Sequence, residues 1–258
     1  MNRIVHLSLK VDDVQGTGDF YHDVFGFQDA ETRKTRDHLS RHMTEGHLDF
    51  TLMKYDAGTQ SKESRASGEG PCIHHFAIEV DDLEKAAAEI RARGCEVVSD
   101  PGVIPVKFRA PGGTVAELVP LGRYKRVTGA QSADRIVHLS LKVDDVQKSG
   151  DFYKEVFGFR DAETRRTRDH VSRHMTDGEI DFTLMKYDAG TRSKESTAAG
   201  EGPCIHHFAI EVKDLDKATR EIASHGSEIV SDPGVVPVKF RAPGGTIAEL
   251  VPHGRYKR

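Results

Sequence analysis

The chain has 258 residues, of which 37% are hydrophobic and 30% are charged, and its formal net charge is −4. This composition is typical of a globular protein with a well-solvated surface, and the acidic balance argues against a nucleic-acid binder, which needs a basic face. No apolar run is long enough for a membrane helix and the start lacks signal-peptide form, so the sequence predicts a cytoplasmic protein whose three cysteines are reduced.

The second half of the chain is a near copy of the first half. Residues 3–126 and 135–258 align without a gap at an offset of 132 residues, with 25 differences in 124 aligned positions. The repeat predicts two tandem domains, over residues 1–126 and 135–258. Residues 127–134 (VTGAQSAD) carry no apolar pattern and are the predicted linker. Because this linker is short, we expect the two copies to contact each other.

Each copy divides again into two units that begin in the same way. The first unit opens with RIVHLSLKVDDV, an alternating strand that leads into a helix start. The helix that follows has Val14, Tyr21 and Phe25 on one face and is expected to end at Gly26. Among the later segments of this unit, HLDFTLMKY is the clearest strand candidate.

The second unit repeats this pattern with a diverged sequence. Its opening strand is CIHHFAIEVDDL, and the next helix has Leu83, Ala87 and Ile90 on one face and an expected end at Gly94. Three strand candidates follow, CEVVSDPGV, PVKFRAP and TVAELVP.

The repeating unit is therefore a βαβββ module of about sixty residues. We predict an α+β fold with four such modules in two tandem domains. The modules cover approximately residues 1–56, 71–126, 135–188 and 203–258.

Strand parity separates the side chains of each opening strand into two faces. In the first unit, Leu7 and Leu9 are assigned to an apolar face together with Val5 and Val11, so His6 points to the opposite face. In the second unit, the same rule selects His75. His74 has the wrong parity for this face and is the less favoured ligand.

The closing strands carry carboxylates on the same open face. Glu117 lies between Ala116 and Leu118 in the last strand of the copy. In the first unit, Asp49 lies between two apolar residues and is expected to take the place of Glu117. If the two sheets face each other around a cleft, the two histidines and two carboxylates of a copy converge.

A lone strand histidine is more often structural, but a single parity rule selects all four groups. Two imidazoles and one carboxylate suit Fe(II), and similar sites hold Mn, Zn, Ni or Co. The predicted metal ligands are His6, His75 and Glu117 in the first copy and His138, His207 and Glu249 in the second. The candidate catalytic carboxylates are Glu117, Glu249, Asp49 and Asp181.

The paired βαβββ units, with histidine in each opening strand and glutamate in the terminal AELVP, resemble the vicinal oxygen chelate superfamily. That superfamily includes glyoxalase I, methylmalonyl-CoA epimerase, type I extradiol dioxygenases and the bleomycin-resistance proteins. The resemblance implies that His6, His75 and Glu117 bind a divalent metal, as do their second-copy counterparts. It also implies chelation of two neighbouring oxygens of a small-molecule substrate, with Glu117 or Asp49 moving a proton.

The resemblance leaves three classes of function. Glyoxalase I and the epimerase have a fourth ligand where Asp49 is expected, so Asp49 can ligate, bind through water or act as a base. Extradiol dioxygenases have a catalytic tyrosine about ten residues before the glutamate, where this chain has Lys107 or Phe108. Bleomycin-resistance proteins sequester a drug in an aromatic-lined cleft, whereas this chain has 7% aromatic residues and no tryptophan. We therefore rank a lyase or isomerase first, a dioxygenase second and a binding protein third.

Other features stay open at this level. A site can form within one copy, or His6 and Asp49 can meet His207 and Glu249 of the other copy. His42 either belongs to a solvated edge strand, which is the favoured interpretation, or contacts a metal ligand or the substrate. Arg109 is either a surface residue or the receptor for a substrate anion. Residues 57–70 (AGTQSKESRASGEG) can form a lid or an inert connection. The sequence predicts no nucleic-acid or membrane partner, and it is compatible with a homo-oligomer.

Overall fold

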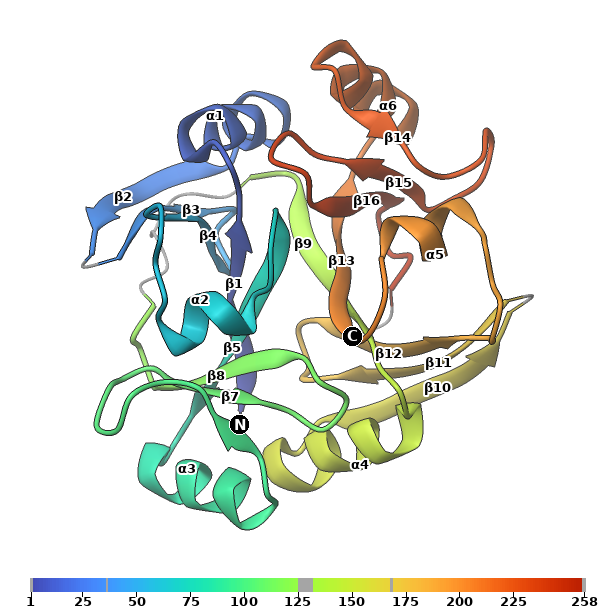
Figure 1. The fold of residues 1–258 in the computed structure, drawn as a ribbon. Helices are drawn as coiled ribbons and strands as arrows, with labels where there is room; N and C mark the ends of the chain where they lie inside the picture. The colour runs from blue at the N-terminus through green and yellow to red at the C-terminus, as the bar shows by residue number, and fades with distance from the viewer. Residues whose placement is uncertain (1, 36, 125–131, 168, 257–258) are drawn as a thin grey trace.

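The computed structural model describes residues 2–35, 37–124, 132–167 and 169–256, and the two copies have the same order of elements (Figure 1). The elements of the first copy are β1 (Arg3–Lys10), α1 (Val14–Phe25), β2 (Gln28–Lys34), β3 (His38–Thr44), β4 (Asp49–Tyr55), α2 (Lys62–Ala66), β5 (Cys72–Val80), α3 (Leu83–Ala92), β6 (Glu96–Val97), β7 (Val106–Arg109) and β8 (Val115–Pro120). The elements of the second copy are β9 (Arg135–Lys142), α4 (Val146–Phe157), β10 (Arg160–Arg166), β11 (His170–Thr176), β12 (Asp181–Tyr187), α5 (Lys194–Ala198), β13 (Cys204–Val212), α6 (Leu215–Ser224), β14 (Glu228–Ile229), β15 (Val238–Arg241) and β16 (Ile247–Pro252).

The strands of each copy form one mixed sheet from its two units. In the first copy the order is β2-β3-β4-β1-β5-β8-β7-β6, with β1 parallel to β4, β5 parallel to β8, and β1 antiparallel to β5. Ile73 of β5 pairs with Ile205 of β13, so the two sheets are continuous across the repeat. The predicted α+β fold of four βαβββ modules is confirmed, with a short helix (α2 or α5) added between the units of each copy.

Local sequence signals explain where the first helix begins and ends. Asp13 caps α1 by accepting hydrogen bonds from the backbone N–H groups of Gln15 and Gly16. Gly26 follows the last turn with φ of 70°, a left-handed conformation that favours glycine. The expected end of this helix at Gly26 is therefore confirmed.

The hydrophobic core lies between the two copies. In Figure 1, α1 of the first copy lies beside the second unit of the other copy, and α4 lies beside α3. The ring of Tyr21 lies 6.3 Å from that of Phe208, and Phe50 lies 5.6 Å from Phe208. In the reciprocal contact, Phe76 lies 5.6 Å from Phe182. The expected contact between copies is thus confirmed, and it leaves the opposite face of each sheet open.

The parity prediction is wrong at one position of β1. The pairing of β1 with β5 shifts register between Ile4 and His6. As a result, the side chain of Ile4 lies in the main core, where that of Val5 was expected. Val5 instead packs on the open face with Ala77 and Val119. Leu7 and Leu9 lie in the core as predicted, and His6 stays on the open face.

Two further sequence predictions concern the connection between copies and the membrane. Residues 127–131 of the predicted linker lie outside the described residues, and Ser132 donates a hydrogen bond to the carbonyl of Phe25 (2.5 Å). Within the described ranges, none of the helices combines the length and apolar character needed to cross a bilayer.

Candidate metal centre

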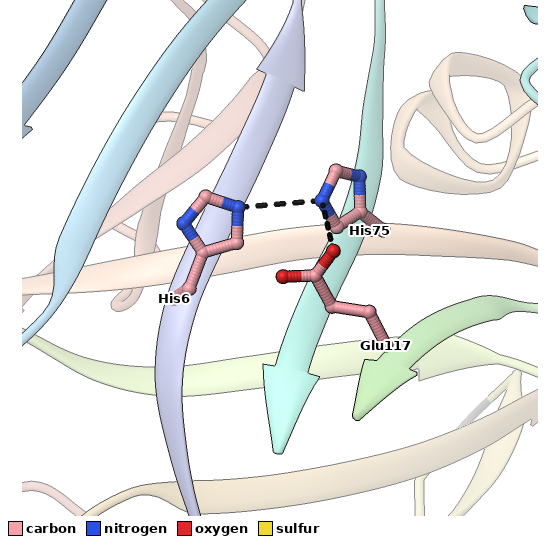
Figure 2. Close-up of side chains that lie close together, drawn as sticks. All are labelled: His6, His75 and Glu117. Atoms are coloured by element: carbon pink, nitrogen blue, oxygen red, sulfur yellow. Dashed lines mark hydrogen bonds and ion pairs between the residues drawn. The ribbon is translucent and has the colours of Figure 1, made fainter. Parts of the chain in front are cut away.

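Three side chains from separate strands meet on the open face of the first copy. His6 comes from β1, His75 from β5 and Glu117 from β8, and Figure 2 shows their polar ends turned toward one another. The Nε2 atoms of His6 and His75 are 3.3 Å apart, and Nε2 of His75 is 3.2 Å from Oε2 of Glu117. All three residues are buried, and their potential ligand atoms lie within 4.8 Å of one another.

The second copy builds the same group. His138, His207 and Glu249 lie together, with 3.2 Å between the histidine Nε2 atoms and 3.3 Å from Nε2 of His207 to Oε2 of Glu249. Each group draws its three side chains from a single copy. Of the two arrangements that the sequence left open, the geometry corresponds to the one within a copy.

The donor set fits a divalent cation. Oε2 of Glu117 is buried, and no described residue makes a hydrogen bond of acceptable geometry to it. Burial lowers the pKa of His75 to about 4, so its imidazole is neutral near pH 7 and has a lone pair to offer. Burial alone would raise the pKa of Glu117, but His75 and Lys107 outweigh this effect and hold it well below the usual range. Neutral imidazoles around an ionised carboxylate are the ligands that Fe, Mn and Zn bind in proteins.

Asp49 lies behind His6, on the far side of the ring from Nε2. Its Oδ1 is 2.6 Å from Nδ1 of His6, and it also contacts Nδ1 of His42 and the hydroxyl of Thr51. Burial would raise the pKa of Asp49, but hydrogen bonds from His42 and His6 lower it strongly. If Nε2 of His6 offers its lone pair to a metal ion, its Nδ1–H donates to this carboxylate.

The pairing of the strands shows which residue of the first unit occupies the position equivalent to Glu117, and this residue is not Asp49. Glu117 pairs with Ala77, which corresponds to Ser8 in the opening strand of the first unit. Ser8 pairs with Thr51, whereas Asp49 pairs with His6. The expectation that Asp49 takes the place of Glu117 is therefore wrong by two residues. A neutral threonine at this place leaves a three-residue donor set without a fourth carboxylate.

His74 contacts the imidazole of His75 at Nδ1, away from the candidate ligand atom Nε2. Its Nδ1 is 2.6 Å from Nδ1 of His75, and its Nε2 is 3.0 Å from the hydroxyl of Tyr55. If Nε2 of His75 offers a lone pair, its Nδ1–H donates to His74, and His74 donates in turn to Tyr55. In this arrangement His74, the less favoured ligand of the pair, acts as a positioning residue for His75.

Two residues that contact the candidate ligands were not predicted from the sequence. The Tyr124 hydroxyl donates to Oε1 of Glu117 (2.6 Å), and its ring stacks on His6 with 4.3 Å between centroids. Lys107 Nζ lies 3.5 Å from Oε2 of Glu117. Tyr124 lies beyond the last strand, so strand parity does not predict the direction of its side chain. In the sequence, Lys107 stands out only as a residue near the position of the dioxygenase tyrosine.

The group lies in a cavity of about 720 Å³ on the open face of the first copy. His42 lines this cavity, and its Nδ1 lies 3.0 Å from Oδ2 of Asp49, so the structure places it at the site and not on a solvated edge strand. Arg109 lies elsewhere, because its guanidinium is held by Glu96 and the carbonyl of Gly113, so the structure does not support it as the receptor for a substrate anion in this cavity. The cavity is lined by residues of both units, among them His6, Ser40, His42, Asp49, Thr51, Met53, Glu63, His75, Lys107, Glu117, Arg123 and Tyr124.

The buried histidines predict a pH dependence of the metal-free protein. The pKa of His75 and of His207 falls from an ordinary value of 6.5 to about 4, so between these values the unfolded chain binds more protons than the folded chain. We therefore expect the free energy of unfolding to fall as the pH is lowered from 6.5 to 4. Urea unfolding of chelator-treated protein at several pH values measures this slope, which should be shallower after His75→Gln with His207→Gln. An equal slope in that variant would contradict the assignment.

Comparison with known proteins adds the family context. The family model described as Glyoxalase/Bleomycin resistance protein/Dioxygenase superfamily matches residues 3–113 and again residues 135–243. The chain is 25% identical over 254 residues to a probable chloroplastic lactoylglutathione lyase of Arabidopsis thaliana, covering 91% of this chain and 67% of that protein. It is 27% identical over 173 residues to another lactoylglutathione lyase of the same plant, covering 61% of this chain and 55% of that relative.

Solved structures share the fold at lower sequence identity. A mutant of 4-hydroxymandelate synthase from Streptomyces coelicolor superposes with a TM-score of 0.74 at 17% identity, covering 99% of this chain and 94% of that one. The Mn(II)-bound glyoxalase from Novosphingobium aromaticivorans gives 0.65 at 18% identity, with coverage of 98% and 83%. A halotolerant catechol dioxygenase gives 0.64 at 16% identity, with coverage of 97% and 86%. At these identities the similarity establishes the fold alone.

Proposed function

Because the chain belongs to the glyoxalase/bleomycin resistance protein/dioxygenase superfamily, we propose that it is a divalent-metal-dependent enzyme with glyoxalase-like lyase or isomerase chemistry. In this proposal His6, His75 and Glu117 hold one metal ion, and His138, His207 and Glu249 hold a second. The observation that carries it is a buried pair of imidazoles and a carboxylate oxygen without a hydrogen bond in each copy. In the first copy, the three residues line a cavity large enough for a small substrate. The relatives named as lactoylglutathione lyases support the reaction class.

A divalent ion held there would supply Lewis acidity for two neighbouring substrate oxygens. The protein's own groups would orient the site and move the proton. Asp49 and His74 each hold one imidazole by its Nδ1 atom, so both rings keep a fixed direction and tautomer. Tyr124 fixes Oε1 of Glu117 through its hydroxyl.

Glu117 is the better supported proton acceptor of the two candidate carboxylates. Its Oε2 has no hydrogen bond from the described residues, whereas both carboxylate oxygens of Asp49 accept from His42, and Oδ1 also accepts from His6 and Thr51. We therefore propose that Glu117, rather than Asp49, takes the carbon-bound proton of the substrate and that Asp49 acts as a positioning residue. Glu249 and Asp181 have the same arrangement in the second copy.

The proposed role of Asp49 predicts a loss of metal affinity. Asp49→Asn together with Asp181→Asn should weaken metal binding by about 10- to 100-fold, because the support of His6 and His138 is lost while all three ligands of each site remain. A calorimetric titration with Mn²⁺ measures this effect. Unchanged affinity with a large fall in kcat would instead assign Asp49 to proton transfer.

A ring-cleaving dioxygenase is the second candidate. The specific observation in its favour is the three-residue donor set, because Thr51 stands where a fourth carboxylate was expected and two histidines with one carboxylate suit Fe(II). The two functions are separated by assaying metal-loaded protein with the hemithioacetal of methylglyoxal and glutathione, and with a catechol. Turnover of the hemithioacetal supports the lyase, and oxygen uptake with the catechol supports the dioxygenase. Purified protein that binds no divalent metal would contradict both.

A further inference from the structure

Lys107 places a cation inside the cavity beside the candidate metal ligands. Its Nζ lies 2.9 Å from Oε2 of Glu63 and 3.5 Å from Oε2 of Glu117, and only 12% of its side chain is exposed. The second copy repeats this arrangement, with Lys239 3.1 Å from Glu195 and 3.2 Å from Glu249. The arrangement is therefore a constant part of both sites.

Two carboxylates face the ammonium group of Lys107, one from Glu63 and one from Glu117. An ammonium ion buried at such a place needs an anionic partner, because its water shell has been removed. If Glu117 binds a metal ion, Glu63 remains as the carboxylate partner of Lys107 among the described residues.

Glu63 reaches the site from an element that is not part of the sheet. It lies on α2, a five-residue helix without buried residues, in the segment that joins the two units. Its carboxylate nevertheless lines the cavity together with His75 and Lys107. A surface helix thus places a carboxylate against a buried cation at the edge of the metal site, where an anionic group of a substrate would also fit.

We propose that Lys107 and Lys239 bind a carboxylate of the substrate, which replaces Glu63 and Glu195 as their partner. The substrate class is then a small hydroxy or oxo acid whose carboxylate lies beside the two chelating oxygens. This inference rests on the proposed metal-dependent function and narrows it.

Two achiral probes test the proposal on Mn²⁺-loaded protein. Glycolate and tartronate share a hydroxyl and a carboxylate on one carbon, and tartronate has a second carboxylate. Calorimetry should show that tartronate binds about tenfold or more tightly than glycolate. A hydrogen bond between the second carboxylate and the ammonium group of Lys107 would account for a difference in affinity of this size. In Lys107→Met with Lys239→Met, this ratio should fall close to that of the two probes for the metal alone. An unchanged ratio would overturn the proposal.

Two further variants make the test specific. Lys10 also contacts the connecting segment, through the carbonyl of Gly68 (2.6 Å), but it does not line the metal cavity, so Lys10→Met with Lys142→Met should leave the ratio unchanged. Glu63→Gln with Glu195→Gln removes the competing carboxylate from a surface helix and should tighten tartronate several-fold. Weaker binding of tartronate in that variant would overturn the proposal even if the lysine variant fails to fold. Wild-type protein that binds no Mn²⁺ would instead contradict the proposed function.

Discussion

His75→Ala together with His207→Ala should abolish stoichiometric metal binding and the activity that depends on it. Each substitution removes one of three donor side chains from a buried site, and the remaining histidine and glutamate of each site cannot replace it. Because loss of a supporting residue already costs about 10- to 100-fold in metal affinity, loss of a ligand should exceed 100-fold. Metal content of the purified variant and a Mn²⁺ titration measure this result.

The neighbouring histidines provide a matched control for this prediction. His74 and His206 are buried next to the same ligands but turn their rings toward Tyr55 and Tyr187. His74→Ala with His206→Ala should therefore weaken metal binding by about 10- to 100-fold without abolishing it. If this control loses the metal and the variant at positions 75 and 207 keeps it, the choice of ligand in each pair is reversed.

Phe208→Ala should lower the free energy of unfolding by about 3–5 kcal/mol. Phe208 belongs to the second copy and is fully buried, with Tyr21 and Phe50 of the first copy packed against its ring. Truncation leaves a cavity at the contact between copies that these rigid rings cannot fill. Denaturant unfolding measures the loss.

A surface position provides the reference for this stability prediction. Leu121 is 57% exposed and is replaced by His253 in the second copy. Leu121→Ala should change stability by less than about 0.5 kcal/mol. A loss below about 1 kcal/mol for Phe208→Ala would contradict a core shared between the copies.

Much of the fold follows from the sequence because its signals are local or repeated. The duplication and the alternating strands predicted four βαβββ modules, and Gly26 marked the end of a helix through its left-handed backbone. Parity also selected His6, His75 and Glu117, because the side chains of a strand can point to only two faces. These three residues are the ones that the structure brings together.

Parity sets the face of a side chain but not its register along the strand. A shift of two residues preserves the face, and for this reason Asp49 was assigned the place that Thr51 occupies. The register shift beside Val5 reverses parity within a single strand, and nothing in the local sequence marks it. Pairing between strands decides both points, and pairing is a long-range property.

The residues that support the ligands were harder to predict for the same reason. Tyr124 lies after the last strand and reaches back to Glu117 and His6, so neither periodicity nor spacing connects it to them. Glu63 approaches Lys107 from a polar connecting segment across 44 positions of sequence. Such contacts depend on how the units pack, which a pattern along the chain does not contain.

The metal stoichiometry of paired histidine variants tests the central claim most directly. Wild-type protein should bind two divalent ions per chain, one in each group of two histidines and a glutamate. His6→Ala with His75→Ala damages one copy only and should leave one ion, whereas His6→Ala with His207→Ala damages both copies and should leave none. One ion in the second variant and none in the first would contradict sites built within each copy, and no ion in the wild-type protein would contradict a metal centre altogether.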